Sequence, residues 1–217
     1  MKRKLVRDGD TAEQIAAVLR AEIVAGDHAP SAILFQEELA ERFQTSRMPI
    51  RDSLKILERE GLVVVPANKS ATVSPLDPAS FMEINEMRAV AEPLALRTAM
   101  PELTNRQIEH AAAIQGKAEK SDIAEFATLN RDFHMALMEP CGRPRLLAHI
   151  ASLNDASQRY FHLAAVNLDY SARSHDEHRA LIKACMTRDT KEACLILERH
   201  ILSASHEMKK ALTVGAD

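Results

Sequence analysis

From Pro78 to the end of the chain, apolar residues recur at helical spacing, and no alternating run typical of a β-strand interrupts them. Short gaps separate the periodic segments, and short connections favour antiparallel neighbours. The sequence therefore predicts an antiparallel all-α bundle over residues 77–217, with an interior that could hold a ligand. About six helices are expected, at about residues 79–100, 104–119, 122–139, 144–166, 171–187 and 190–212.

The first 76 residues follow a different pattern. One helix ends at Gly26, a short second helix follows, and a third, "RMPIRDSLKILEREGL", stops at Gly61. Two short apolar runs flank "PANKS" and predict a β-hairpin. Three helices followed by a hairpin form a winged helix-turn-helix, whose third helix enters the major groove of DNA. We expect a mainly α chain with two domains, a winged helix-turn-helix at 1–76 and the helical bundle at 77–217.

The charge of the chain limits how it could bind DNA. Its net charge is −3, and the first 75 residues hold 11 basic and 11 acidic residues, so the contacts must come from a local patch. A cationic stripe on the third helix offers Arg for guanine and Ser for phosphate, and Lys residues reach phosphates. Such a stripe alone is more often a solvated face, but here it lies between a turn and a hairpin. The acidic Glu37, Glu38 and Glu41 are expected on the second helix, away from the groove. The residues assigned to DNA binding are Ser46, Arg47, Met48, Arg51, Lys55, Asn68 and Lys69.

The cysteines indicate the compartment. Cys141, Cys185 and Cys194 are odd in number and far apart, which argues against a disulfide framework and fits a reducing cytoplasm. No apolar run approaches the length of a membrane span. The sequence therefore predicts a cytoplasmic protein that makes no membrane contact.

Polar residues fall on the inner faces of several bundle helices. Asn130 and His134, in "TLNRDFHMAL", are one helical turn apart. His178 and His200 would lie level with each other on two antiparallel helices, where they could share a metal ion. A lone His on an apolar face is more often a hydrogen-bonded core residue. Spacing alone leaves the following histidines open as alternatives: His149, His162, His175 and His206.

The segment "LAERFQTSRMPIRDSLKILEREGLV" resembles the signature of the GntR family of bacterial transcription regulators, in which Ser-Arg-x-Pro-[Val/Ile]-Arg opens the recognition helix. The family usually has Pro-Gly before the second helix, where this chain has Ser31-Ala32. It often has Gly at the wing tip, where this chain has Asn68, a residue that also tolerates a left-handed backbone. The resemblance implies that double-stranded operator DNA is the partner of the first domain.

The bundle region resembles the FCD domain, the ligand-binding domain of the FadR-like branch of that family, in "NRDFHMAL", "EHRALIKA" and "ERHI". The resemblance implies a divalent metal ion, zinc by preference with nickel or manganese as alternatives. Many members have Asp at the position of Asn130, and an amide brings no negative charge, so weaker metal binding is expected here. The metal ligands that the resemblance implies are Asn130, His134, His178 and His200.

The same resemblance implies a small organic acid as effector. A metal held by neutral imidazoles keeps its positive charge and open positions, which suit a carboxylate. The family often has an Arg on the first bundle helix facing the effector, and here that residue is Arg88. The alternative for Arg88 is an ordinary ion pair with Glu92, one turn further on.

The leading hypothesis is a homodimeric transcription factor that binds a palindromic operator and is modulated by a carboxylate effector at a metal site. It is not expected to be an enzyme. The alternative is a metal-dependent enzyme, because three His and an open position also describe catalytic zinc. Against that alternative, no Asp or Glu stands beside these histidines as an obvious general base. A metal site that only stabilises the fold is a third interpretation.

Overall fold

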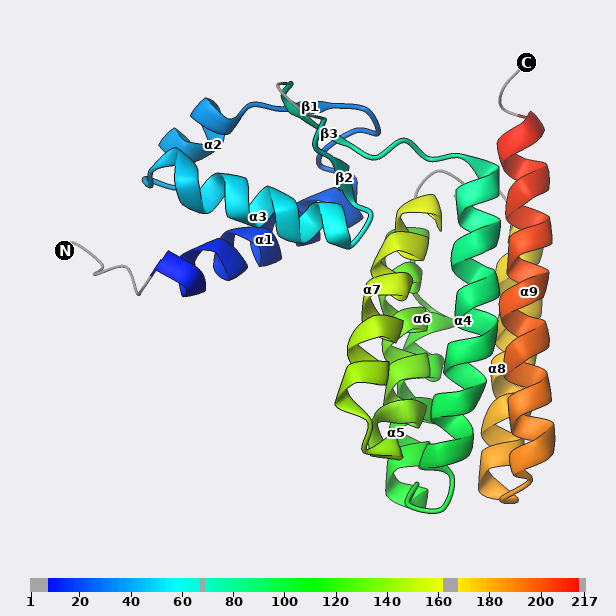
Figure 1. Ribbon diagram of the computed structural model, residues 1–217. Coiled ribbons are helices and arrows are strands. Elements are labelled where there is room, and N and C mark those ends of the chain that lie inside the picture. Colours follow the sequence, from blue (N-terminus) through cyan, green and yellow to red (C-terminus); the bar gives the residue numbers. More distant parts are fainter. Residues whose placement is uncertain (1–7, 67–68, 162–167, 215–217) are drawn as a thin grey trace. The chain divides into compact units, whose positions relative to one another are not determined.

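The computed structural model describes residues 8–66, 69–161 and 168–214, and the chain divides into two compact units, Met1–Leu76 and Asp77–Asp217 (Figure 1). The first unit is a winged helix-turn-helix, as predicted, with three helices and a small sheet. Its elements are α1 (Asp8–Ala25), β1 (Ile33–Leu34), α2 (Gln36–Arg42), α3 (Arg47–Arg59), β2 (Val63–Val64) and β3 (Ala71–Val73).

The apolar core of this unit holds α3 in place. Leu19 and Ile23 of α1 belong to one buried cluster with Ile50, Leu54 and Leu57 of α3. Spacings of three and four residues place them on one face of each helix. Burying such a side chain stabilises the fold by about 1.5–3 kcal/mol relative to leaving it in water. The opposite face of α3 is therefore free to carry charged side chains.

The predicted hairpin is present, and a third strand that the sequence does not reveal completes the sheet. β2 pairs antiparallel with β3, with Val63 opposite Val73. β1 pairs with the other edge of β3, with Ile33 opposite Thr72, which gives the strand order β1-β3-β2. A strand of two residues is too short to show alternation, so hydrophobic pattern could not predict β1.

Glycines end two helices of this unit, and a serine takes a similar backbone conformation. Gly26 and Gly61 follow α1 and α3 as predicted, with φ of 86° and 73°. Ser31 has φ of 65°, in the left-handed region where a side chain costs about 1–2 kcal/mol. Ser31 therefore has a backbone conformation that glycine adopts at lower cost.

We expect Ser31→Gly to raise the free energy of unfolding by up to about 1 kcal/mol, because relief of strain outweighs the added entropy of the unfolded chain. Urea unfolding measures the change. Ala32→Gly is the matched control: the neighbouring residue has no positive φ to relieve, so this variant should be less stable than the wild type. Equal destabilisation by both substitutions would show that the backbone at Ser31 is unstrained.

The second unit is an antiparallel bundle of six α-helices over the described residues, and each helix runs opposite to the one before it (Figure 1). A 3-10 helix, η1 (Glu139–Cys141), lies between α6 and α7. The observed bounds lie close to the predicted ones, except that α7 ends at Phe161 and residues 162–166 lie outside the described chain. The helices are α4 (Pro78–Ala99), α5 (Asn105–Ala118), α6 (Ile123–Met138), α7 (Pro144–Phe161), α8 (Leu168–Met186) and α9 (Thr190–Val214).

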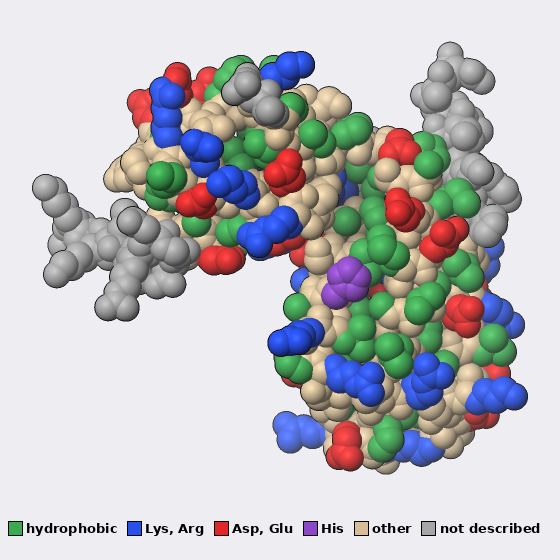
Figure 2. All heavy atoms as spheres, in the orientation of Figure 1, with side chains coloured by type: hydrophobic (Ala, Val, Ile, Leu, Met, Phe, Trp, Pro, Cys, Tyr) green, Lys and Arg blue, Asp and Glu red, His purple; other side chains and the backbone are tan. Residues whose placement is uncertain are grey.

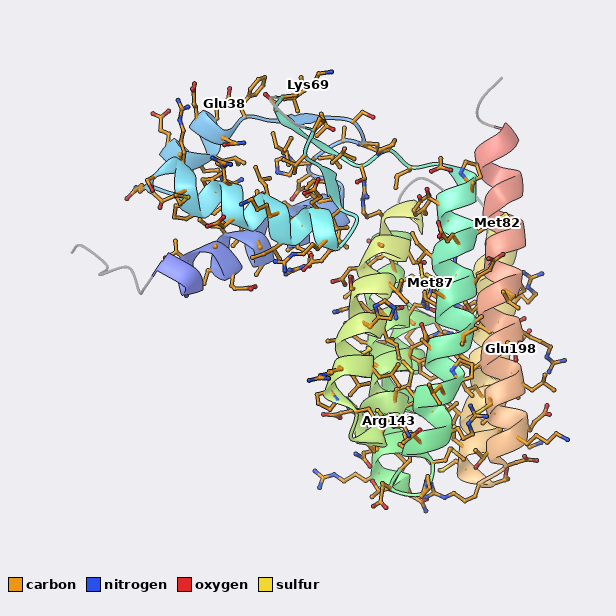
Figure 3. All side chains as sticks on the ribbon, viewed as in Figure 1. Glu38, Lys69, Met82, Met87, Arg143 and Glu198 are labelled. Atoms are coloured by element: carbon orange, nitrogen blue, oxygen red, sulfur yellow. The ribbon has the colours of Figure 1, made fainter. Side chains whose placement is uncertain are left out.

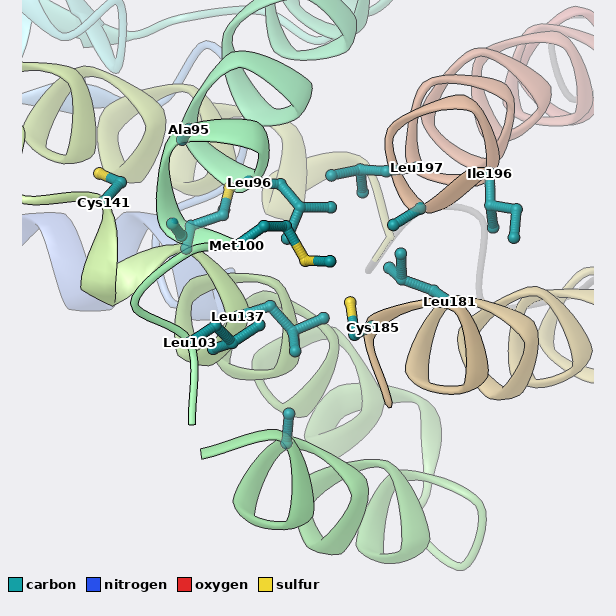
Figure 4. Packing of buried hydrophobic residues seen from close by; sticks show 14 of the residues in the cluster. Ala95, Leu96, Met100, Leu103, Leu137, Cys141, Leu181, Cys185, Ile196 and Leu197 are labelled. Carbon is teal, nitrogen blue, oxygen red and sulfur yellow. The ribbon is translucent and has the colours of Figure 1, made fainter. Parts of the chain in front are cut away.

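Apolar side chains fill the half of the bundle nearest the α8–α9 turn (Figure 4). Leu96 of α4, Leu137 of α6, Leu181 of α8 and Leu197 of α9 are buried there. Cys185 joins them, and burial raises the pKa of its thiol to about 12. All three cysteines are free thiols. Within the described residues, no helix combines the length and apolar character needed to cross a membrane.

Candidate functional site

Three histidines from three helices meet inside the bundle. His134 lies on α6, His178 on α8 and His200 on α9, and they are 1%, 0% and 3% exposed. The Nε2 atom of His178 lies 3.3 Å from Nε2 of His134 and 3.2 Å from Nε2 of His200. The ring of Phe133 stacks on His178 with 4.2 Å between centroids, which fixes the plane of that imidazole. The structure thus brings together the three histidines that the resemblance selected.

The other ring nitrogen of each histidine faces a hydrogen-bond acceptor. Nδ1 of His134 lies 2.7 Å from Oε2 of Glu92, and Nδ1 of His200 lies 2.7 Å from Oε2 of Glu177. Nδ1 of His178 lies 2.6 Å from Oε1 of Gln115. An ionised carboxylate only accepts hydrogen bonds, so Nδ1 of His134 and of His200 must each carry the proton.

The orientation of the Gln115 amide gives His178 the same tautomer. Nε2 of Gln115 donates to Oε1 of Glu119 at 3.2 Å, which leaves Oε1 of Gln115 facing His178 as an acceptor. Nδ1 of His178 therefore donates. Burial lowers the pKa of His134, and it lowers the pKa of His178 well below the usual value, with His200 and His134 adding to the effect. The imidazoles of His134 and His178 are therefore neutral and carry a bare lone pair on Nε2.

When all three rings are neutral with the proton on Nδ1, their Nε2 atoms cannot hydrogen-bond to one another, because none has a proton to donate. They form instead a set of three ligand atoms that lie within 4.8 Å of one another. Tetrahedral zinc with Zn–N of about 2.0–2.1 Å needs nitrogens about 3.3–3.4 Å apart. The spacings of 3.3 and 3.2 Å are close to that requirement. The residues present therefore fit a divalent metal ion.

Asn130 lies beside this set, one turn before His134 on α6. Its side chain is buried, and its Oδ1 is one of three buried side-chain atoms in the described residues that lack a hydrogen-bond partner. An unpaired buried carbonyl oxygen costs free energy unless something else binds it. Asn130 therefore has an oxygen available for a metal ion or a ligand.

Arg88 forms the ion pair that the sequence left as an alternative. Its Nε donates to Oε1 of Glu92 at 2.7 Å, and its Nη1 donates to Asn85 and to Ser157. Asn154 of α7 also donates to Oε1 of Glu92, at 3.1 Å. Burial would raise the pKa of Glu92, but Arg88 and His134 lower it to about 2, so the carboxyl is ionised.

Glu92 and Glu177 correct one expectation from the sequence, since carboxylates do stand beside the histidines. Glu92 comes from α4, 42 residues before His134 in the chain, so local spacing gave no sign of the contact. Glu177 is the residue before His178 but bonds to His200, on the neighbouring helix. Both lie behind the rings, on the Nδ1 side.

Of the alternative histidines, His149 and His175 do not join the three that meet. The Nδ1 of His175 accepts a hydrogen bond from Nε2 of Gln115 at 2.9 Å, so it belongs to the layer behind His178. His149 lies exposed on α7. The side chains of His162 and His206 lie outside the described residues.

The first unit carries the assigned DNA-binding residues on its surface. Ser46 is the N-cap residue of α3, and the other assigned residues of that helix follow it. Figure 3 labels Lys69 on the wing. Asn68 lies outside the described residues. The assigned residues that the structure describes are all exposed: Ser46, Arg47, Met48, Arg51, Lys55 and Lys69.

Glu37 does not lie apart from the candidate recognition helix, contrary to expectation. Its carboxylate accepts a hydrogen bond from Nη2 of Arg47, because the first turn of α2 faces the start of α3. Arg47 and Lys69 also line one surface cleft together. The residues that line this cleft are Phe35, Gln36, Glu37, Arg47, Lys69 and Ser70. The cleft joins the start of α3 to the wing, so both could contact one DNA backbone.

Family models match both units of the chain. Residues 11–73 match the model described as bacterial regulatory proteins, gntR family, and residues 83–203 match the FCD domain. The FCD match alone covers more than half of the 217 residues.

Individual relatives agree with the family models. The uncharacterized HTH-type transcriptional regulator BphR of Paraburkholderia xenovorans is 27% identical over 199 residues, covering 86% of this chain and 80% of the relative. The HTH-type transcriptional repressor GlaR of Escherichia coli is 24% identical over 206 residues, covering 89% and 94%. Among solved structures, Escherichia coli McbR/YncC superimposes with a TM-score of 0.79 at 21% identity, covering 96% of this chain and all of that one.

The helix-turn-helix and the helical bundle thus each match a family model, and full-length relatives carry both in the same order. The chain is therefore a DNA-binding transcription regulator that belongs to the GntR family and carries a C-terminal FCD domain.

Proposed function

We propose that the protein is a metabolite-responsive regulator: a homodimer binds a palindromic operator, and a small carboxylate bound at a metal ion in the bundle changes its DNA affinity. The observation that carries the effector part is the meeting of three imidazoles with bare Nε2 atoms. Histidines used only for packing would donate or accept hydrogen bonds with different groups. Here the arrangement is favourable only with a cation between them.

The DNA part rests on the exposed cationic residues at the start of α3. Arg51 lies one turn after Arg47, so both can face the same groove. In the free protein Glu37 neutralises Arg47, and DNA must replace that contact. The pair is exposed, so it holds Arg47 only weakly.

We expect Arg51→Ala to weaken specific DNA binding by roughly 1–3 kcal/mol, the loss of a base contact. Glu37→Gln should instead tighten binding about two- to fivefold, because Arg47 no longer has to leave an exposed ion pair. Electrophoretic mobility shifts with the operator measure both. Lys117→Ala, on α5 of the bundle, is the control and should change nothing. Equal binding by wild type and Arg51→Ala would reject α3 as the recognition helix.

A dimer is supported by apolar side chains exposed on α4. Val90 is 73% exposed and Met87 is 40% exposed, and they lie one turn apart on the same face. Figure 3 labels Met87, and Figure 2 shows hydrophobic side chains across the visible face of the bundle. One recognition helix reads too few base pairs for specificity, whereas two related by a two-fold axis read a palindrome.

We expect Val90→Asp to convert the dimer to a monomer, because it places a charge within an apolar interface. Light scattering after size exclusion gives the mass, and operator affinity should fall by about a hundredfold or more as the second half-site contact is lost. Met186→Asp, at another exposed apolar position at the end of α8, should remain dimeric. A dimeric Val90→Asp protein would place the interface elsewhere.

The proposed metal ligands are His134, His178 and His200, with Asn130 as a weaker fourth. Zinc is the favoured ion because imidazole nitrogens suit it and because the spacings from His178 to His134 and to His200 are close to those of tetrahedral geometry. When bound, the ion supplies a positive centre that attracts an anion. Nε and Nη1 of Arg88 donate hydrogen bonds to other residues, whereas Nη2 makes no hydrogen bond among the described residues. Nη2 could therefore contact the same effector.

We expect His134→Ala, His178→Ala and His200→Ala each to lower metal affinity by at least about 10–100-fold. Removing a residue that only hydrogen-bonds to a metal ligand already lowers affinity by that factor, and removing the ligand itself should cost at least as much. Asn130→Asp should raise it, because a carboxylate adds charge. Elemental analysis after dialysis measures the metal, and His149→Ala is the matched control. Stripping the metal should also abolish thermal stabilisation by carboxylates. A triple His→Ala protein that retains one metal per chain would refute the site.

The enzyme alternative is less well supported. A general base must lie within hydrogen-bond reach of the reacting group, on the open side of the metal. Glu92 and Glu177 bond to Nδ1 atoms behind the rings, so neither carboxylate faces that side. Metal removal separates the three functions: an enzyme loses turnover, a structural site loses its fold, and a sensor loses effector affinity.

A further inference from the structure

Ser174 has a buried hydroxyl group that nothing in the described structure satisfies. The residue is 1% exposed, and its Oγ has no hydrogen-bond partner among the described residues. The buried hydroxyl of Ser53 bonds backwards to the carbonyl of Ile50, and the half-buried hydroxyl of Thr98 bonds to that of Leu94, both at 2.8 Å. Ser174 makes no such bond. An unpaired buried hydroxyl lowers the free energy of unfolding. A ligand that bonds to this hydroxyl would remove that cost.

Ser174 shares the inner face of α8 with a candidate metal ligand. It lies four residues before His178, so the two side chains lie on one face of the helix, a turn apart. His178 points to the interior, where its Nε2 meets those of His134 and His200. Ser174 therefore also points to the interior.

Helix direction places two more polar residues at the level of Ser174. Because consecutive helices are antiparallel, α4, α6 and α8 run in the same direction (Figure 1). Asn130 lies one turn before His134 on α6, and Arg88 lies one turn before Glu92, the partner of His134, on α4. Arg88, Asn130 and Ser174 thus form one polar layer, about 5.4 Å along the bundle from the histidines.

The charges in this layer favour a neutral ligand group. The guanidinium of Arg88 is balanced by Glu92 at 2.7 Å, and Asn130 and Ser174 carry no charge. A second carboxylate placed here would have no cation of its own. A hydroxyl can both accept from the serine and donate to an oxygen.

We propose that Ser174 hydrogen-bonds a hydroxyl group of the effector, which is a hydroxy acid whose carboxylate binds at the three histidines and whose hydroxyl lies about one helical turn away. The inference rests on the metal-anchored carboxylate proposed above. Ser174 then makes the protein bind an acid with a hydroxyl one turn away from its carboxylate more tightly than the same acid without that hydroxyl. A site built to bond a hydroxyl discriminates against an analogue that lacks it.

Three acids that differ only in one hydroxyl test this: valerate, γ-hydroxyvalerate and α-hydroxyvalerate. Calorimetric titration of the metal-loaded, full-length wild type should show γ-hydroxyvalerate binding about tenfold more tightly than valerate, the effect of one hydrogen bond. Ser174→Ala should abolish that advantage. It should leave the ratio of α-hydroxyvalerate to valerate unchanged, because an α-hydroxyl lies beside the carboxylate and does not reach α8.

Two measurements separate this role from a structural one. Ser174→Ala should keep its metal content and be at least as thermally stable as the wild type, because the hydroxyl that it removes is buried without a partner. Ser203→Ala is the matched control on α9: its hydroxyl donates to the carbonyl of His200 at 3.0 Å, so the preference for γ-hydroxyvalerate should persist.

Each outcome has a distinct meaning. If γ-hydroxyvalerate and valerate bind equally to the wild type, or if Ser174→Ala keeps the preference, the inference about Ser174 is wrong and the metal-anchored carboxylate stands. If none of the acids binds the metal-loaded protein, the proposed carboxylate effector is wrong and the inference fails with it.

Discussion

Three hydrogen bonds donated by histidine Nδ1 atoms determine how the imidazoles are oriented inside the bundle. Glu92 of α4, Gln115 of α5 and Glu177 of α8 each accept one, and each thereby turns a bare Nε2 toward the same point. Five of the six described helices contribute either a histidine or an acceptor. Without a cation the three lone pairs would repel one another. For the proposed metal ion these nitrogens would be ligands already oriented by the protein, which avoids the cost of ordering them on binding.

The helix α4 shows how the bundle separates stability from ligand binding. Half of its six buried residues before Pro93 are polar, namely Asn85, Arg88 and Glu92. Its buried residues after Pro93 are apolar and join the cluster near the α8–α9 turn. The apolar half supplies hydrophobic stabilisation that the polar half lacks, since buried polar groups gain little unless every one is paired. The unpaired oxygens of Asn130 and Ser174 lie at the polar end.

Sequence reasoning succeeded where periodicity or a local motif carried the information. The helices and the hairpin were accessible because spacing of three, four or two residues reports which side chains share a face. Spacing left several histidines open, and the family resemblance selected the three that meet. The acceptors behind the histidines were not accessible, because Glu92 and Gln115 lie 42 and 63 residues from their partners. Ser174 gives no signal in the sequence either, since only the packed interior shows that its hydroxyl has no partner. The misplacement of Glu37 has the same origin: sequence assigns it to α2 but cannot show that α2 begins beside Arg47.

The position of α4 in the chain gives the proposed regulation a short covalent route. Only Ser74–Leu76 separate β3 of the wing from Asp77, whose carboxylate caps α4 by accepting from the backbone N–H of Ala79 at 2.9 Å. Arg88 follows 11 residues later, about 16 Å along the same helix. An effector that draws on Arg88 therefore acts on the helix to which the DNA-binding unit is joined. Because α4 is capped and continuous over Pro78–Ala99, a displacement at Arg88 moves its first turn as well. Linkage limits the result: the effector can change DNA affinity only by the difference in its own affinity for the two states, typically about 1–3 kcal/mol.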